Sequence, residues 1–477
     1  MNPEVLKGSF TLGAADFSRK ALLAMTVLLC ARLLSPGTFG DYIFLISFYQ
    51  IFSVLAGAGL PNSLLRAVAR TKNSGMRFAL ASVFVRLIYI VPASGLMYAF
   101  MRMMGFSQQY VPALGLLTLM MIFRGTSENV AFIFQGHEDR LSAAKIGVAQ
   151  STTTLFVTLA VCLTSKNLLL LIGAHVLGGL LSSVYGFILL WLKYGAGKPG
   201  EAIWEQSRSL LGESHWLNAG SFVASVYNRL DVVLLRRLFT PEAVAIYAAP
   251  YRILDFTQIV PASLMVTILP SLCRTEEANT EMMHPRRAAR FLLLIAISLV
   301  VMITLAAPLV TLLLFGAKYY GSIPVLQILI WATVPMYWNF VLNSQLIARS
   351  ADRAILYAAI IALAINVTLN LLLIPKYGYL ACAGVTLATE FALLGTNIYF
   401  VRRIGVIPWP ENLGRLIVTT ILVAGFCICW TRAGYGPIGT ALLILAIFSF
   451  PVFRSDFLES EVPRRAGNTT PVTRIVG

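Results

Sequence analysis

The stretch "RLLSPGTFGDY" (residues 32–42) returns as "RLFTPEAVAIY" (residues 237–247), aligned without gaps at an offset of 205 residues. In each copy one apolar run ends at a turn with a proline, which restricts φ and ends the first helix, and a second apolar run follows. Farther along, "LPNSLLR" (60–66) resembles "LPSLCR" (269–274) at the end of the second run. We interpret the pattern as a duplication of a helical unit.

The composition around these turns is that of a membrane protein. The 477 residues are 58% hydrophobic and 12% charged, whereas soluble domains carry about 25% charged residues. Many apolar runs reach about 20 residues, which is the length that a helix needs to cross a membrane. The runs are continuous, and this excludes an outer-membrane β-barrel, whose strands alternate. The chain is therefore predicted to be an all-α, polytopic integral membrane protein.

The apolar runs predict about fourteen transmembrane helices, near residues 10–34, 38–60, 78–103, 110–135, 141–164, 167–193, 213–238, 243–270, 289–315, 323–348, 353–374, 379–401, 414–431 and 436–453. Six spans separate the two repeated turns, so both turns lie on the same side of the membrane. We therefore expect residues 8–193 and 209–402 to superpose as pseudo-symmetric six-helix bundles, related by an axis along the membrane normal, around a central cavity.

The predicted domains follow from this map: an N-terminal bundle (1–193), a cytoplasmic linker (194–208), a C-terminal bundle (209–403), two further helices (404–453) and a polar cytoplasmic tail (454–477).

The distribution of basic residues tests the orientation of the chain in the membrane. With a cytoplasmic N-terminus, inside segments carry 23 Lys and Arg and outside segments carry 8. This bias predicts that both termini are cytoplasmic in a bacterial inner membrane, and it explains the net charge of +16 without nucleic acid.

Six basic and five acidic residues fall inside the predicted spans: Arg19, Lys20, Arg86, Arg124, Arg229, Arg252, Asp16, Glu128, Asp231, Asp255 and Glu390. Charges are costly in hydrocarbon, so these residues are expected to line a water-filled cavity or to pair between helices. Asp16–Lys20, Arg124–Glu128 and Arg252–Asp255 have the i,i+4 or i,i+3 spacing of ion pairs on one helix face. Both alternatives, structural pairs and a binding site, stay open for them.

The unpaired bases favour an anion site. No acid lies within one turn of Arg86, and Arg229 has no partner within its own helix. Guanidinium groups bind phosphate oxygens through two parallel hydrogen bonds, so we expect a mid-membrane site for a phosphate-bearing solute. Arg86 is the leading candidate, unless it pairs with an acid on another helix such as Asp231 or Glu390. Arg19 and Lys20 can alternatively extend to the inner surface.

Four blocks of the chain resemble a known family. The quoted turns, with "LLLFGAKYYGSIPVLQILIW" (312–331) and "INVTLNLLLIPKYGYLACAGVTLATE" (365–390), are similar to polysaccharide transporters, the O-unit flippases of the multidrug/oligosaccharidyl-lipid/polysaccharide exporter superfamily. The resemblance spans roughly residues 8 to 402. It implies translocation of undecaprenyl-pyrophosphate-linked oligosaccharides by alternating access, with basic cavity residues at the pyrophosphate.

The candidate site residues can then be divided by expected role. The bases expected to bind substrate are Arg86, Arg124, Arg229, Arg252, Arg19 and Lys20. The acids expected to bind a coupling proton or sodium ion are Asp231, Glu390, Asp255 and Glu128. The expected partners are the lipid-linked saccharide, membrane lipids, the coupling ion and polysaccharide polymerase machinery.

Other functions were weighed against this one. The six cysteines have neither metal-ligand nor disulfide-framework spacing. No catalytic triad or phosphate-binding loop is present in the sequence. Neither an enzyme nor a cofactor is therefore expected, and a membrane glycosyltransferase is disfavoured. A cation- or proton-coupled multidrug antiporter of the same superfamily and a peptidoglycan-precursor flippase remain alternatives, and the sequence does not reveal the saccharide.

Overall fold

A computed structural model describes residues 3–405 except 58–59, 71–74, 107, 196–206, 209, 211–214, 273–277 and 350, together with the single residues 407, 409, 414, 418 and 425. The chain divides into two units, residues 1–417 and 418–477, and the elements named below all belong to the first. Apart from the single residues 414, 418 and 425, the predicted helices near 414–431 and 436–453 lie outside the described residues, as does most of the predicted linker.

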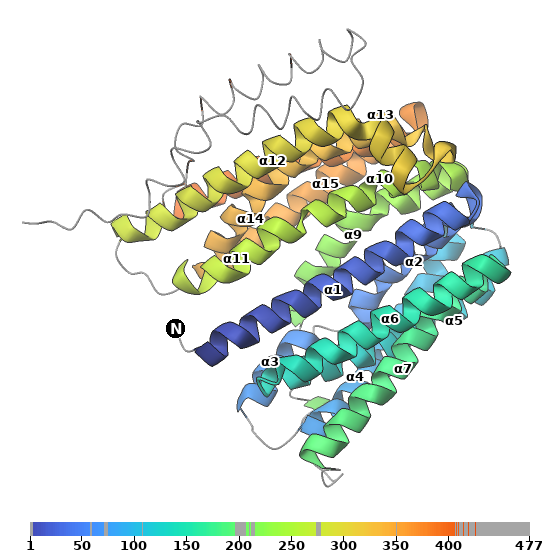
Figure 1. Cartoon of the computed structure of the whole chain (residues 1–477), viewed down its shortest axis with the longest axis vertical. Coiled ribbons are helices and arrows are strands. Elements are labelled where there is room, and N and C mark those ends of the chain that lie inside the picture. The colour runs from blue at the N-terminus through green and yellow to red at the C-terminus, as the bar shows by residue number, and fades with distance from the viewer. Residues whose placement is uncertain are drawn as a thin grey trace, which may run out of the picture. The chain divides into compact units, whose positions relative to one another are not determined.

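The first half of the unit contains the six predicted spans and one additional short helix. Its elements are α1 (Pro3–Leu33), α2 (Pro36–Gly57), α3 (Leu60–Arg70), α4 (Gly75–Met103), η1 (Gln108–Tyr110), α5 (Val111–Gly136), α6 (Arg140–Thr164) and α7 (Leu168–Tyr194) (Figure 1). The short helix α3 carries the "LPNSLLR" motif and packs against α5. Asp139 and Asn167 cap the N-termini of α6 and α7 with their side chains.

The second half repeats the series with two breaks. Its elements are α9 (His215–Leu238), α10 (Pro241–Thr257), α11 (Ile259–Leu272), α12 (Ala278–Leu314), η2 (Ala317–Tyr319), α13 (Ser322–Leu329), η3 (Ile330–Ala332), α14 (Thr333–Ala348), α15 (Asp352–Tyr377) and α16 (Tyr379–Ile404). The predicted span 243–270 is therefore two helices, and the span 323–348 is divided by η3. Among the described residues, nine helical segments are long and apolar enough to cross a membrane.

The two halves pack their helices in the same pattern. In the first half α1 contacts α6, α4 contacts α5, and α7 contacts both α5 and α6. The corresponding pairs in the second half are also in contact: α9 with α15, α12 with α14, and α16 with both α14 and α15. The order of the helices and their partners thus agree, as expected for a duplicated bundle.

A buried tyrosine in each half shows the correspondence at single residues. Tyr42 lies six residues after the proline that begins α2, and Tyr247 lies six residues after the proline that begins α10. Tyr42 is hydrogen-bonded to His175 (2.7 Å), and Tyr247 to Thr386 (3.2 Å). His175 and Thr386 each lie seven residues after the start of the helix that forms the sixth predicted span of their half, α7 and α16.

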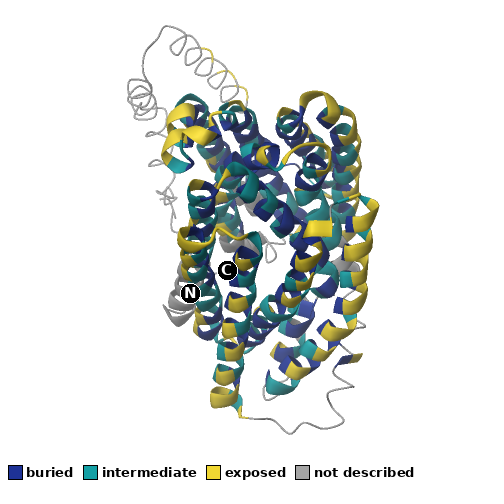
Figure 2. Ribbon diagram, turned by 90° about the vertical axis from the view of Figure 1, so that its right-hand side faces the viewer, coloured by how far each residue is buried: buried dark blue, intermediate teal, exposed yellow. Residues whose placement is uncertain are grey.

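Small residues let helix backbones approach closely. Close packing matters in a membrane, because apolar side chains gain little from leaving lipid for another apolar surface. One buried face of α7 consists of Gly178, Gly179, Ser182, Ser183 and Gly186. A Cβ at position 179 would lie 2.7 Å from the backbone nitrogen of Arg124 on α5. Large exposed apolar residues such as Val91, Phe156 and Leu192 lie elsewhere on the helices, and Figure 2 shows exposed positions along their outer faces. These exposed residues suit contact with lipid.

The two halves meet along α2, which contacts both α9 and α10. The end of the unit at which α1 is connected to α2 is called here the turn end. Near it, a Cβ on Gly40 would lie 1.8 Å from the Pro241 carbonyl oxygen. The backbones of α2 and α10 therefore touch there at a distance that only glycine permits. The pocket described next lies farther along the same helices.

Candidate functional site

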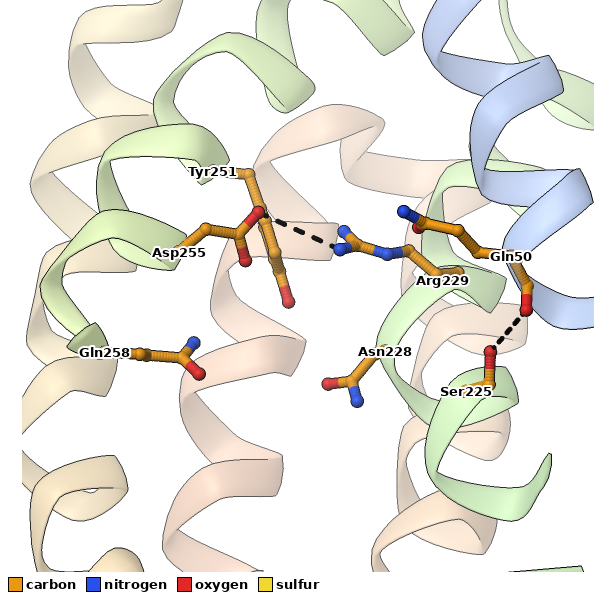
Figure 3. A pocket seen from close by; sticks show the side chains of 7 residues that line it. All are labelled: Gln50, Ser225, Asn228, Arg229, Tyr251, Asp255 and Gln258. Atoms are coloured by element: carbon orange, nitrogen blue, oxygen red, sulfur yellow. Dashed lines mark hydrogen bonds and ion pairs between the residues drawn. The ribbon is translucent and has the colours of Figure 1, made fainter. Parts of the chain in front are cut away.

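A polar pocket of about 390 Å³ lies among α2, α9 and α10. Its lining residues are Gln50, Ser225, Asn228, Arg229, Tyr251, Asp255 and Gln258. On α9, the lining residues have i, i+3 and i+4 spacing, which places them on one face. Figure 3 shows Asp255 and Arg229 pointing toward one another from opposite walls, with the amides of Gln258 and Asn228 on the same side of that pair. The pocket therefore combines charged groups with neutral hydrogen-bonding groups.

Two guanidinium groups share one carboxylate at this pocket. Arg252 donates from Nη1 to Asp255 Oδ2 at 2.9 Å, and Arg229 Nη2 lies 3.8 Å from the same oxygen. The guanidinium of Arg229 also lies over the Tyr251 ring, 5.7 Å from its centre. The ionised cluster carries a net charge of +1. The expected Arg252–Asp255 pair is confirmed, and Arg229 has its charged partner on the neighbouring helix α10.

Arg86 lies outside this pocket. Its side chain is buried, with 4% of the residue exposed. It donates hydrogen bonds from Nη1 to the Met121 carbonyl (3.2 Å) and from Nη2 to Asn129 Oδ1 (3.1 Å), both on α5. The expectation that Arg86 faces a water-filled cavity thus differs from the structure. A carbonyl and an amide oxygen accept from its two Nη groups, where an acid of another helix was the expected alternative.

The remaining predicted bases are also placed away from the pocket lining. Arg124 donates from Nε to Glu128 Oε1 at 3.3 Å, which confirms that i,i+4 pair. Arg19 lies against α6, where a Cβ on Gly147 would be 3.0 Å from its Cδ. Arg19 and Lys20 are both half-buried and have partners in the structure. The side chain of Asp16 lies outside the described residues.

Two buried carboxylates of the second half have neutral hydrogen-bond donors. Glu390 accepts from Tyr227 (2.6 Å) and from Asn339 Nδ2 (3.2 Å). Asp231 accepts from the Tyr247 hydroxyl and from the Val232 N–H. Both are at least 95% buried, so they are separate from the open pocket. Within the described part of the chain, no three metal-ligating side chains gather into a site.

Polar contacts join the halves at the turn end. Arg236 of α9 donates to Asp41 of α2 at 2.9 Å, and Tyr110 donates to the same carboxylate oxygen at 2.7 Å. Lys318 of η2 donates to the carbonyl oxygens of Arg32 and Leu34, at the end of α1. With the contact between Gly40 and Pro241, these bonds close the interface between the halves at this end.

Sequence reasoning missed Gln50, Ser225, Asn228, Tyr251 and Gln258. Gln50 is an uncharged polar residue inside an apolar run, which is a weak signal because such residues also bond between helices. Ser225 and Asn228 could have been found from their spacing to Arg229. Gln258 stands between α10 and α11, and Pro261, the third residue of α11, is the sequence signal of this break, because a proline has no N–H to bond the Thr257 carbonyl.

Comparisons with known proteins agree with this arrangement. The family model described as "Polysaccharide biosynthesis protein" matches residues 5–276. No curated protein matches the chain by sequence. Among solved structures, the lipid II flippase MurJ in an inward closed conformation is 13% identical, with 94% of this chain and 99% of that chain covered and a TM-score of 0.74.

Two multidrug transporters have the same fold. An inward-facing multidrug resistance MATE family transporter of the MOP superfamily is 16% identical, with 81% of this chain and 94% of that chain covered and a TM-score of 0.65. A Vibrio cholerae MATE transporter is 11% identical, with 83% and 98% covered and a TM-score of 0.55. At such low identities these likenesses establish the fold, which is that of membrane transporters and flippases.

Proposed function

This chain belongs to the polysaccharide biosynthesis protein family, and we propose that it translocates lipid-linked saccharides across the bacterial inner membrane by alternating access. The proposed substrate is an oligosaccharide unit on undecaprenyl pyrophosphate. In this proposal both termini are cytoplasmic and the turn end faces the periplasm. Transport between leaflets requires no chemical change of the substrate, in keeping with a transporter fold.

The pocket beside α2 is the observation that carries this proposal. Arg229 lines it with an exposed fraction of 16% for its side chain, close enough to water to accept a ligand. A guanidinium binds a phosphate through charge-assisted hydrogen bonds of about 1.5–3 kcal/mol each. Amide groups such as those of Gln50, Asn228 and Gln258 can donate to and accept from sugar hydroxyls. The site thus has groups for both parts of the proposed substrate.

Arg229 replaces Arg86 as the leading candidate for the pyrophosphate, since Arg229 lines the pocket and Arg86 is enclosed between α4 and α5. Arg252 is proposed to act beside it. Asp231 and Glu390 are proposed to bind the coupling proton or sodium ion, because each is a buried carboxylate whose hydrogen-bond donors are neutral. A buried carboxylate in such surroundings is stabilised by taking up a proton or a cation.

Export in a flippase-null strain tests the proposal. Arg229→Ala should lower saccharide export by about tenfold or more, equivalent to one charge-assisted hydrogen bond. Arg229→Lys should recover only part, because an ammonium group lacks the bidentate fork. Arg237→Ala, an exposed base on the same helix, is the matched control and should export normally. Full export by a well-folded Arg229→Ala protein would contradict the proposed site.

A peptidoglycan-precursor flippase is the second candidate, favoured by the likeness to the MurJ fold over 94% of this chain. The two candidates share a pyrophosphate group and differ in the saccharide. Growth of a strain depleted of its lipid II flippase separates them: rescue by this chain would support the second candidate. A multidrug antiporter would instead raise drug resistance in a strain that lacks efflux pumps, and we expect no such increase.

A further inference from the structure

The carboxylate of Asp255 lines the pocket opposite the guanidinium of Arg229, where an anionic ligand would bind, and it also bonds Arg252, which is not among the lining residues. Its Oδ2 lies 2.9 Å from Arg252 Nη1 and 3.8 Å from Arg229 Nη2. The shorter contact is a hydrogen bond within α10. The longer one crosses the pocket from α10 to α9 and exceeds the length of a normal hydrogen bond. Charge attraction, and no hydrogen bond of normal length, therefore joins Arg229 to this carboxylate.

Exposure distinguishes Asp255 from its partners. One third of its side chain is exposed (33%), compared with 16% for Arg229 and 15% for Arg252. The carboxylate is thus more accessible to a ligand than either guanidinium. A ligand that enters the pocket meets the carboxylate together with the guanidinium that the carboxylate partly neutralises.

The charges of this cluster do not match a pyrophosphate. A pyrophosphate esterified at both ends carries two negative charges, whereas two guanidinium groups and one carboxylate sum to +1. If Asp255 did not contribute its charge, the sum would be +2 and would match the ligand. At separations of about 4 Å, an additional like charge repels the ligand substantially, even with the screening of a partly exposed site.

We propose that Asp255 is an internal competitor for the anionic group of the substrate, and that its competition keeps binding weak enough for release. This inference rests on the proposed function. When the pyrophosphate binds, it replaces Asp255 at Arg229, and Arg252 continues to hold the displaced acid. When the ligand leaves, Asp255 returns to Arg229. Asp255 is thus a positioning residue that sets the affinity of the site, since it acts through Arg229.

A direct binding measurement tests this role. The probe is N-acetylglucosamine linked to farnesyl pyrophosphate, whose pyrophosphate is esterified at both ends, titrated against the purified full-length protein in lipid nanodiscs by isothermal calorimetry. Asp255→Asn keeps the size and the acceptor oxygen but removes the competing charge, so it should bind the probe about tenfold more tightly. Saccharide export by the same variant should be slower, because release becomes limiting. A residue that only supported the fold would instead lose affinity and export together.

A second variant gives the opposite sign. Asp255→Glu keeps the charge and the partner Arg252 and extends the carboxylate toward Arg229, so it should bind the probe more weakly than the wild type. It also decides the matter if Asp255→Asn fails to fold. Glu242→Gln, an exposed acid at the other end of α10, is the matched control and should bind like the wild type.

The outcomes separate the two levels of the proposal. Equal or weaker binding by Asp255→Asn, or equal or tighter binding by Asp255→Glu, would overturn the competitor role. Arg229→Ala reports on the site itself. Wild-type affinity in that variant would overturn the proposed pyrophosphate site, whereas lost affinity in Arg229→Ala with unchanged affinity in Asp255→Asn would remove only the competitor.

Discussion

Arg86 shows how a charged residue can be accommodated in a helical bundle without a charged partner. Its guanidinium lies directly against a glycine: a Cβ on Gly125 would be 1.8 Å from Nη1. The bonds to Met121 and Asn129 satisfy two of its nitrogens, and its buried Nε has no hydrogen-bond partner among the residues that the structure describes. A buried charge that loses its few partners is strongly destabilising. The position therefore suits a structural role.

The first prediction follows from that glycine. Gly125→Ala should displace the Arg86 guanidinium and lower stability by about 3 kcal/mol or more, because the charge loses its buried hydrogen bonds. Gly115→Ala, on the same helix with nothing within 4 Å of the added Cβ, is the control and should leave stability nearly unchanged. Thermal unfolding of the detergent-purified proteins measures both. Combining Gly125→Ala with Arg86→Met should restore part of the lost stability. A fully stable Gly125→Ala protein would show that Arg86 does not depend on the space beside Gly125.

A second prediction concerns Asp139, which caps α6 outside the spans. Burial alone would raise the pKa of Asp139, but hydrogen bonds from Lys193 and Ser142 outweigh burial and hold it below its usual value of 3.8. A lowered pKa in the folded state stabilises the protein above the unfolded pKa, and this contribution is lost as pH falls through the folded value. It is therefore present above about pH 4 and disappears below it.

Asp139→Asn removes the charge and keeps a capping oxygen. The variant should be about 0.5–1 kcal/mol less stable at neutral pH, after allowance for the exposure of Lys193. The difference should shrink as the pH falls below about 4 and Asp139 takes up a proton. Unfolding temperatures of the two proteins from pH 7 to pH 3 measure it, with Asp352→Asn in the first turn of α15 as the control. A difference independent of pH would show that the cap acts without its charge.

At the residue scale, the sequence identified contacts within a helix and missed those between helices. Arg252–Asp255 and Arg124–Glu128 follow from spacing alone, because one helix turn brings such side chains together. Arg229–Asp255 and Arg86–Asn129 join different helices. No periodicity of either helix determines which residue of the neighbour faces it, so these partners required the structure.

At the scale of elements, apolar run length located most of the described helices to within several residues, although α12 begins at Ala278, eleven residues before its predicted start, and it did not reveal where the helices break. The break between α10 and α11 falls inside the predicted span 243–270, where Pro261 has no N–H to bond the Thr257 carbonyl. The Thr257 carbonyl, at the end of α10, accepts a hydrogen bond from the Tyr337 hydroxyl of α14 (2.5 Å). Because backbone groups inside a membrane need a partner, a tyrosine far along the chain stabilises this break.

The third prediction tests that contact. Tyr337→Phe removes one oxygen from a fully buried ring and leaves the Thr257 carbonyl without this donor. The cost should be about 1–3 kcal/mol of stability, the range for an unsatisfied buried acceptor. Tyr357→Phe, at an exposed position of α15, is the control and should unfold at the wild-type temperature. Equal unfolding temperatures for both variants would show that the break does not depend on Tyr337.

At the scale of the whole molecule, orientation rests on the distribution of basic residues. Positions 199 and 434 lie outside the described residues, in the predicted linker and in the turn between the last two predicted helices. With the native cysteines replaced, a cysteine at 199 should be protected from an impermeant thiol reagent in intact cells, and one at 434 should be labelled. Labelling at 199 from outside would reverse the proposed orientation.

The duplicated halves explain why closure at one end matters for transport. Alternating access requires the interface between halves to open at each end in turn. At the turn end, α2 and α10 meet through Gly40 and the Pro241 carbonyl, and Arg236 joins Asp41 nearby. The repeat places Ala245 on α10 at the position that corresponds to Gly40, and it is fully buried. A cysteine there would report on opening.

The last prediction uses both positions. A side chain at position 40 cannot fit while the turn end is closed, since even its Cβ would overlap the Pro241 carbonyl. Gly40→Val should therefore shift the population toward conformations in which α2 and α10 separate at this end. In a background without native cysteines, Ala245→Cys should react several-fold faster with an impermeant thiol reagent when Gly40→Val is present. Gly115→Val provides the control, because its added side chain starts in open space.

Saccharide export should fall in the Gly40→Val protein, since a turn end that cannot close prevents the return to the state with the other end open. An unchanged labelling rate in a folded Gly40→Val protein would mean that this contact yields without opening the interface, and closure would then depend on Arg236, Asp41 and Lys318.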